Sequence, residues 1–204
     1  MRIILVDHQD SFTYNLFHDL GVVAGTEPKV IDSREVTAQS VGTLEGDPVL
    51  VVLSAGPGHP AREDDSGGSL QLIRDLIGRV PIFGVCFGLQ LIVHALGGRI
   101  VEARRIVHGR SLPVHHRRTG LFRCLPSPVS MMRYHSLVAE RRTLPADLVV
   151  TAESAEGEVM AIEHRRLPIW AVQFHPESVG SPQGRILLEN VVMAARGAPA
   201  AAFA

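Results

Sequence analysis

The sequence predicts an α/β protein: a doubly wound, mostly parallel sheet with helices on both faces and a small strand-rich second half. Short continuous apolar runs, such as residues 49–53, are typical of strands buried on both faces. These runs alternate with stretches whose apolar residues recur at helical spacing. That alternation is expected where helices connect parallel strands.

The first hundred residues follow the order β-α-β-β-α-β-α. Strands are predicted over residues 3–6, 30–31, 49–53 and 81–85. A first helix can be capped by Asp10 or Ser11 and is expected to end at Gly21. Two more helices are predicted over an apolar stripe at residues 70–77 and over residues 89–96. The glycine- and proline-rich residues 54–60 form a loop after the third strand.

The second half is richer in strands and ends in a helix. Strands are predicted over residues 99–103, 129–132, 148–152, 159–163 and 169–174. The last helix is expected to start at Ser181-Pro182, with serine as its cap and proline as its first residue. Gly197 and Pro199 should stop it. We therefore predict one domain over residues 1–196 and a frayed tail over 197–204.

The composition excludes several classes of protein. The 204 residues include 20 basic and 21 acidic side chains without a block of like charge, so neither nucleic acid nor a membrane surface is an expected partner. No apolar run approaches the roughly 18 residues of a membrane span. The two cysteines have no CxxC spacing, which predicts neither a disulfide framework nor a zinc site, and a cytoplasmic location is expected.

The segment Gly84-Val85-Cys86-Phe87-Gly88 lies between a predicted strand and a predicted helix. This is the setting of a nucleophile elbow, here with cysteine as the nucleophile. Glycines on both sides let strand and helix approach closely, and the helix N-terminus favours the thiolate. The backbone amide of Phe87 points into the same space and can bind an oxyanion. A buried structural cysteine is the alternative.

The segment Gln173-Phe174-His175-Pro176-Glu177 supplies a base and a group to orient it. In an extended chain, residues two apart face the same side, so Glu177 can hold one ring nitrogen of His175 while the other faces a thiol. Taken alone, the segment would be a surface turn. Combined with the elbow cysteine, it predicts a Cys86–His175–Glu177 triad.

The turn Gly56-Pro57-Gly58 follows a predicted parallel strand, where α/β sheets bind ligands. Its free amides can complete an oxyanion hole. A phosphate-binding loop is rejected because the G-K-[ST] ending is missing, and a plain turn is the remaining alternative.

The remaining histidines and the second cysteine are predicted to carry no chemistry. His115 and His116 precede two arginines, which predicts an exposed polar turn without a metal. His135 is assigned a structural or interface role. Cys124 is expected to be a small buried or half-buried residue.

Together these motifs resemble the class I (triad) glutamine amidotransferases. The resemblance extends over residues 7–177 and is supported by further blocks in the same order: Asp10-Ser11-Phe12-Thr13-Tyr14-Asn15, Gly56-Pro57-Gly58-x-Pro60, His108-Gly109 and Tyr134-His135-Ser136-Leu137. The D-S-F-T-Y-N block resembles the chorismate branch, which holds the glutaminase subunits (component II) of anthranilate synthase and aminodeoxychorismate synthase.

The resemblance implies a role for each matching residue. Cys86 would attack the side-chain amide of glutamine, His175 would shuttle the proton to the departing ammonia, and Glu177 would hold the imidazole. The amides of Gly58 and Phe87 would stabilise the oxyanion. The amino-acid end of L-glutamine would be gripped by Gln90 and by the backbone of Ser136 and Leu137.

The resemblance also implies a partner synthase that adds the ammonia to chorismate. That partner would carry Mg²⁺ and the chorismate site, so this chain would need no cofactor. Phe87 and Leu89 replace the usual Leu and His of the anthranilate pattern G-V-C-L-G-H-Q. Leu at this position resembles fused anthranilate synthases and phenazine-type aminodeoxyisochorismate synthases, which leaves the product open. Two further hypotheses are a catalytically weak regulatory component of such a synthase and a stand-alone cysteine hydrolase of γ-glutamyl compounds.

Overall fold

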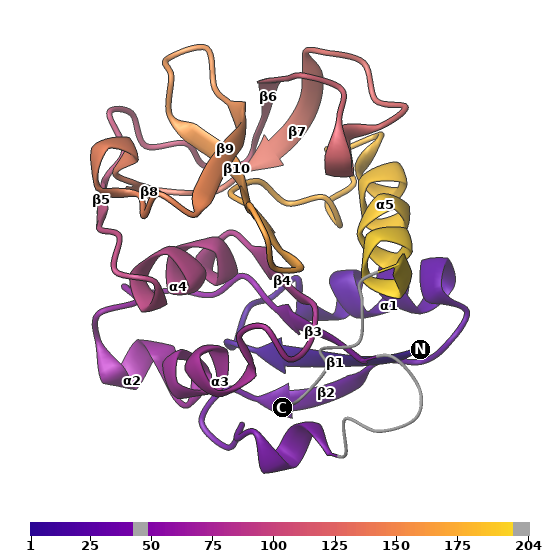
Figure 1. Ribbon diagram of the computed structural model, residues 1–204. Helices are drawn as coiled ribbons and strands as arrows, with labels where there is room; N and C mark the ends of the chain where they lie inside the picture. Colours follow the sequence, from indigo (N-terminus) through magenta and orange to yellow (C-terminus); the bar gives the residue numbers. More distant parts are fainter. Residues whose placement is uncertain (43–48, 198–204) are drawn as a thin grey trace.

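The computed structural model describes residues 1–42 and 49–197 (Figure 1). Its strands are β1 (Arg2–Asp7), β2 (Lys29–Asp32), β3 (Val49–Leu53), β4 (Ile82–Val85), β5 (Ile100–Glu102), β6 (Arg110–His116), β7 (Val129–Arg133), β8 (Leu137–Ala139), β9 (Leu148–Glu153), β10 (Val159–His164) and β11 (Ile169–Val172). Its α-helices are α1 (Thr13–Ala24), α2 (Glu63–Ser66), α3 (Ser69–Leu76), α4 (Phe87–Ala95) and α5 (Gly184–Gly197). The predicted tail from residue 198 onward lies outside the described residues.

Nine of these strands form one mixed sheet in the order β2-β1-β3-β4-β11-β10-β9-β6-β7. Strands β2, β1, β3, β4 and β11 run parallel, and β10, β9, β6 and β7 continue the sheet in antiparallel pairs. Strand β5 pairs separately with β8. The predicted α/β class is confirmed, and β6, β7, β9 and β10 of the strand-rich second half form the antiparallel part of the same sheet (Figure 1).

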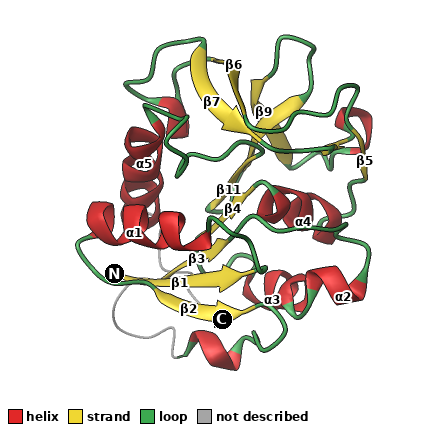
Figure 2. Cartoon of the chain, turned by 180° about the vertical axis from the view of Figure 1, so that it is seen from behind, coloured by secondary structure: helices red, strands yellow, loops and turns green. Residues whose placement is uncertain are grey.

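Alternate residues of the parallel strands pack against different helices. On β1, Ile3 and Leu5 belong to the same hydrophobic cluster as residues of α1 and α5. Ile4 and Val6 belong to the cluster that contains residues of α3 and α4. This alternation follows from the two-residue period of a strand. Helices therefore cover both faces of the parallel strands (Figure 2).

Two strands, β6 and β8, were not predicted from the sequence. Strand β6 contains His115 and His116, so the predicted exposed turn at these residues is wrong. They pair with Glu153 and Ala152 of β9, and the ring of His116 stacks on Phe122 at a centroid distance of 4.4 Å. Pro113 and the charged residues around it hid the alternation typical of a strand.

Helix α1 is longer than predicted. It runs past Gly21 to Ala24, and Gly25 ends it in the left-handed conformation with φ of 67°. At the start, Asp10 accepts a hydrogen bond from the backbone N–H of Phe12 at 2.9 Å, just before the helix proper. The helix continues beyond Gly21, and its last residue, Ala24, is buried.

Helix α5 starts at Gly184, later than the predicted Ser181-Pro182 start. The hydroxyl of Ser181 accepts a bond from the N–H of Met132 and donates one to the carbonyl of His175, at 2.9 and 2.6 Å. Ser181 therefore ties the His175 segment to β7 and does not cap the helix. A Cβ at Gly184 would lie 1.8 Å from the carbonyl oxygen of Pro176, so glycine permits the close approach of α5 to that segment.

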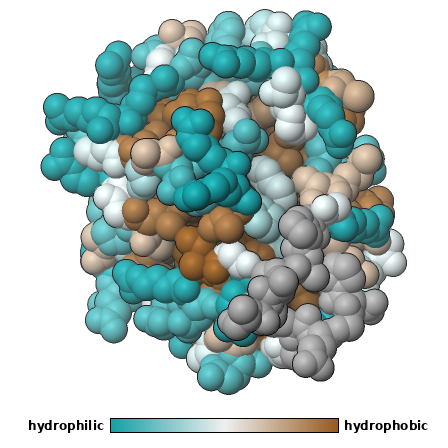
Figure 3. Space-filling model, in the orientation of Figure 1, coloured by the Kyte–Doolittle hydropathy of each residue, from teal (hydrophilic) through white to brown (hydrophobic). Residues whose placement is uncertain are grey.

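Hydrophilic side chains surround smaller hydrophobic areas on the face shown in Figure 3. Within residues 1–42 and 49–197, no helix combines the length and apolarity needed to cross a membrane.

The glycines of the elbow generate a stability prediction. A Cβ on Gly84 would lie 2.5 Å from the backbone carbon of Gly88, and neither backbone can move without shifting β4 or α4. We expect Gly84→Ala to lower the free energy of unfolding by about 3 kcal/mol. Urea denaturation measures this change.

Gly197→Ala is the matched control, because a Cβ there meets no atom within 4 Å. Its free energy of unfolding should stay close to that of the original chain. Equal effects of the two substitutions would contradict the close packing of β4 on α4.

Candidate active site

Cys86 occupies the sharp turn between β4 and α4. Its φ of 51° and ψ of −98° place a non-glycine residue in a strained backbone region. The N–H of Cys86 donates to the carbonyl of Val172 on β11 at 2.7 Å. A Cβ on Gly88 would lie 2.4 Å from the carbonyl oxygen of Leu53. The turn is therefore held by its neighbours on both sides.

The imidazole of His175 is held by Glu177. Its Nδ1 lies 2.7 Å from a carboxylate oxygen of Glu177, and both side chains are buried. The Nε2 of His175 meets no partner with full hydrogen-bond geometry within the described part of the chain, but Cys86 lies near enough to the ring to raise its pKa. The ring is thus fixed from one side, and its second nitrogen is available for proton transfer.

The electrostatics of this pair favour a charged imidazole. Burial alone lowers the pKa of His175, but the nearby thiolate of Cys86 and the carboxylate of Glu177 outweigh it and raise the pKa well above its usual value. The charges beside the ring thus favour the imidazolium, which places an acid next to the predicted nucleophile.

Two aromatic rings pack against His175. Tyr134 contacts it edge to face at a centroid distance of 5.1 Å, and Phe12 does so at 6.3 Å. Phe12 and Tyr134 also stack on each other at 5.5 Å. These rings help to fix the plane of the imidazole that Glu177 holds at Nδ1.

The loop of Gly56 and Gly58 follows β3 and approaches the start of α4. A Cβ on Gly56 would lie 3.3 Å from the ring of Phe87 and 2.6 Å from the Cβ of His8, so this loop lies close to both. Gly58 has a φ of 96°, a conformation that favours glycine. The structure thus brings the predicted oxyanion loop close to the first residue of α4.

Gln90, on α4, reaches the segment after β7. Its Nε2 donates to the carbonyl of Leu137 at 3.2 Å and to the side-chain oxygen of Gln173 at 3.4 Å. Gln173 in turn donates to the sulfur of Cys86 at 3.5 Å. A chain of hydrogen bonds therefore connects Leu137 to Cys86 through Gln90 and Gln173.

Ser136 has an exposed side chain. Its carbonyl accepts a hydrogen bond from the N–H of Ala103, which uses one of the two lone pairs of that oxygen. Cys124 is exposed, which corrects the expected burial. His135 is buried, and both of its ring nitrogens lack partners among the described residues.

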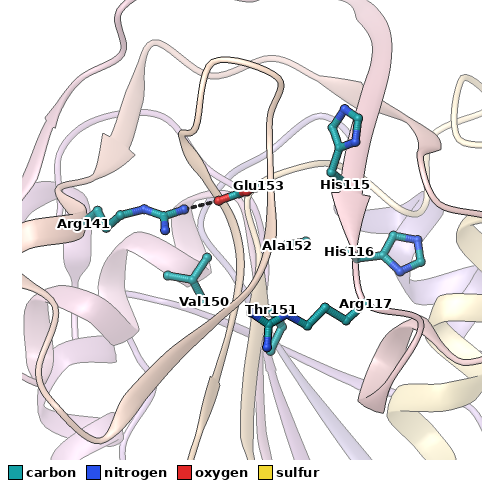
Figure 4. Close-up of a pocket in the computed structure, with 8 residues that line it drawn as sticks. All are labelled: His115, His116, Arg117, Arg141, Val150, Thr151, Ala152 and Glu153. Carbon is teal, nitrogen blue, oxygen red and sulfur yellow. Dashed lines mark hydrogen bonds and ion pairs between the residues drawn. The ribbon is translucent and has the colours of Figure 1, made fainter.

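A separate pocket of about 340 Å³ lies over the antiparallel strands (Figure 4). It is lined by His115, His116, Arg117, Arg141, Val150, Thr151, Ala152 and Glu153. Arg141 forms an ion pair with Glu153 across it. These residues belong to β6, β9 and adjoining segments, whereas Cys86 follows β4. Residues 1–42 and 49–197 contain no group of three side chains suited to hold a metal ion.

The sequence of the chain matches the family model of the class-I glutamine amidotransferases over residues 4–195. The chain belongs to this family. The match includes the elbow, the glycine loop and the His175–Glu177 segment.

Curated relatives of this amidotransferase chain have names from one branch of the family. It is 43% identical to an anthranilate synthase component 2 of Pseudomonas putida, over 93% of this chain and 96% of that protein. It is 47% identical to an aminodeoxychorismate synthase of Streptomyces griseus, over 93% of this chain. It spans only 25% of that protein, and 26% and 31% of two other long relatives.

A solved structure from Thermoplasma acidophilum shares the fold of this amidotransferase chain. Its title describes a GMP synthase component, and it matches with a TM-score of 0.82 and 27% identity over 96% of this chain and 94% of that chain. The likeness includes the antiparallel part of the sheet, because it extends over almost the whole of both chains.

His8, which lies beneath the glycine loop of this amidotransferase, was not predicted from the sequence. It is 4% exposed, and its two ring nitrogens contact the hydroxyls of Ser54 and Ser69 at 3.2 and 2.8 Å. Its ring also meets Phe87 edge to face at 5.4 Å. A polar residue directly after a buried strand was the available signal.

The buried His8 generates a pH prediction. Burial lowers the pKa of His8 to about 4, below the value of about 6.5 in the unfolded chain. The unfolded state therefore binds the additional proton, and stability is lost as the pH falls from about 6.5 towards 4. When the pH is lowered from about 7.5 to 5, the free energy of unfolding of the original chain should fall by about 2 kcal/mol more than that of His8→Asn. Urea denaturation at both pH values measures this.

His18→Asn is the control, since it replaces a histidine of α1 that is not buried. Its loss of stability over the same interval should match that of the original chain. If His8→Asn also loses as much as the original chain, His8 does not remain neutral in the folded protein.

Proposed function

We propose that this chain is a glutaminase subunit that delivers ammonia to a chorismate-utilising partner synthase. The observation that carries the proposal is the strained elbow cysteine combined with a buried His175–Glu177 pair at 2.7 Å. The similarity to an anthranilate synthase component 2 over nearly its full length supports the same assignment.

In the proposed reaction, the thiolate of Cys86 attacks the carbonyl carbon of the glutamine side-chain amide, and a C–S bond forms. The backbone amides of Gly58 and Phe87 stabilise the oxyanion that results. The C–N bond then breaks, and His175 donates its proton to the departing nitrogen, so ammonia leaves. Water attacks the remaining thioester, His175 takes a proton from it, and glutamate is released as the C–S bond breaks.

The raised pKa of His175 supports the order of these steps. The group must carry a proton when ammonia departs, and the thiolate and Glu177 keep it protonated near neutral pH. Once the sulfur of Cys86 is acylated, its negative charge is gone and only that of Glu177 remains beside the ring. The pKa of His175 then falls, which prepares the ring to accept a proton from water.

Glutamine itself is proposed to bind between the elbow and the segment after β7. Gln90 and the backbone of Ser136 and Leu137 would hold its amino-acid end. Gln90 already touches the carbonyl of Leu137, so the two predicted contacts belong to one surface. Gly56 and Pro57 would line the opposite side of the same site.

The proposed reaction needs no cofactor on this chain, and Mg²⁺ and chorismate would be bound by the partner. The two free cysteines support a cytoplasmic location. The product is left between anthranilate and an aminodeoxychorismate, because relatives with both names are similar to the chain. A phenazine-type aminodeoxyisochorismate pathway is the alternative.

Leu89 does not favour the hypothesis of a catalytically weak component. Its side chain is fully buried in the cluster that also contains Leu53 and Val93. It belongs to the packing of α4 on the sheet, so this departure from the anthranilate pattern lies in the core and not among the side chains that bond Cys86.

We expect Cys86→Ala to lower glutamine-dependent synthesis by the complex with its synthase at least about 1,000-fold, because the nucleophile is removed. Synthesis from free ammonium should remain, since the partner carries the acceptor site. Cys124→Ser, which alters the exposed cysteine, is the control and should retain both activities. Loss of neither activity in Cys86→Ala would show that Cys86 is not the nucleophile.

The acceptor is tested with glutamine labelled with ¹⁵N on its side-chain amide, supplied with chorismate to the complex that the chain forms in its own host. Mass spectrometry should find the label in an aminated chorismate derivative, and its mass shows whether pyruvate was lost. Labelled ammonia alone would indicate a glutaminase that serves a different acceptor. No release of label would refute the proposed glutaminase and favour a regulatory role.

A further inference from the structure

Gln173 is a fully buried polar residue directly after β11. Its backbone N–H donates to the carbonyl of Met160 at 2.9 Å, which fixes it to β10. It lies two residues before His175, from which a bend at residues 173–174 separates it. A buried amide needs hydrogen-bond partners, because leaving it unsatisfied costs free energy.

The side chain of Gln173 finds its partners on the elbow and on α4. Its Nε2 lies 3.5 Å from the sulfur of Cys86, and its oxygen lies 3.4 Å from the Nε2 of Gln90. Gln90 Nε2 has two hydrogens, and its other contact is the carbonyl of Leu137 at 3.2 Å. Both of these hydrogens therefore have acceptors.

This network fixes which end of the Gln173 amide faces the sulfur. If the amide were reversed, its NH₂ group would meet the NH₂ group of Gln90, and two donors would face each other. Gln90 cannot turn its own amide to match, because the carbonyl of Leu137 needs the donor end. The amide of Gln173 must therefore present its N–H to Cys86.

We propose that Gln173 is a further catalytic residue, which stabilises the Cys86 thiolate by a hydrogen bond from its side-chain N–H. A donor without charge favours the ionised sulfur over the thiol, because a charged acceptor makes the stronger bond. It does so without competing for the proton that His175 carries. Through Gln90, the same amide couples the nucleophile to the residue proposed to grip glutamine. This inference rests on the proposed function.

The hydrogen bond from Gln173 should affect both the pH dependence and the rate of reaction of Cys86. A hydrogen bond to a charged group shifts a titration by about one pH unit. It also makes the thiolate less nucleophilic, by about threefold for one unit. Loss of the bond should thus move reaction of Cys86 to higher pH and raise, rather than lower, the rate reached when all of the sulfur is ionised.

The test is the pH profile of alkylation of the full chain by iodoacetamide, read at Cys86 and Cys124 separately by peptide mass spectrometry. Gln173→Met keeps an unbranched side chain but removes the donor. In Gln173→Met, we expect the midpoint of the pH profile of Cys86 alkylation to rise by about one pH unit. The rate on the high-pH plateau should rise about threefold. Cys124, exposed on the same molecule, is the internal reference and should keep its profile.

Two further variants make the result specific. Gln173→Leu also lacks the donor and should repeat the shift, which keeps the proposal testable if Gln173→Met does not fold. Gln90→Met keeps the Gln173 amide but removes the partner that fixes its orientation, so the Cys86 midpoint should move in the same direction by less than half as much. An unchanged midpoint with a lower plateau in the Gln173 variants would overturn the proposal in favour of a packing role. A joint shift of Cys86 and Cys124 would overturn it as a global change.

Alkylation requires neither glutamine nor a synthase. A failure of the chorismate assignment therefore leaves this experiment informative, and a failure of this experiment leaves the glutaminase proposal standing. The two inferences can be judged independently.

Discussion

The positive φ of Cys86 is the constraint on which the rest of the site depends. A non-glycine residue in this conformation costs of the order of 1–3 kcal/mol. The elbow is held in it by the contacts of Cys86 with Val172 and of Gly88 with Leu53. The bond from Cys86 N–H to Val172 fixes the turn to the strand that leads to His175. This bond links the turn that carries the nucleophile to the strand that precedes the base.

The link from the turn to the antiparallel strands completes the site. Ser181 bonds both Met132 and His175, and Gly184 brings α5 against Pro176. The segment with the base is therefore held between β7 and the start of a helix. This explains why the strand-rich second half contributes to the site although no strand in it carries the nucleophile.

The parallel strands and the elbow could be predicted from the sequence because both rest on local rules. Continuous apolar runs such as β3 are typical of strands with both faces covered, and glycines beside Cys86 have a steric reason that needs no tertiary information. The pairing of His175 with Glu177 was predicted on the assumption of an extended chain, but residues 176–177 form a turn, and in this turn the two side chains meet at 2.7 Å.

The features that the sequence did not reveal depend on contacts between distant segments. Strand β6 is held by pairing with β9 and by the stack of His116 on Phe122, which no local pattern encodes. Ser181 resembles a helix cap, but its hydroxyl instead bonds Met132 of β7 and the carbonyl of His175. Gln173 gave no signal beyond its motif, because its role appears only when Gln90 and Cys86 are brought to it.

Three buried histidines show why burial alone does not decide chemistry. Burial lowers the pKa of both His8 and His135 to about 4. The ring partners of His8 are hydroxyls, which cannot offset the loss of water around a charge, and the charges that act on His135 belong to Arg133 and His175. His175 is equally buried, yet a carboxylate and a thiolate lie beside it and raise its pKa. Of these three rings, only that of His175 is held in the doubly protonated, charged form at neutral pH, and only its pKa is raised by the charge on Cys86. The fold therefore makes His175 the acid by placing the charges of Cys86 and Glu177 beside its ring. Because one of these charges belongs to the nucleophile, the pKa of His175 depends on whether the sulfur of Cys86 is charged.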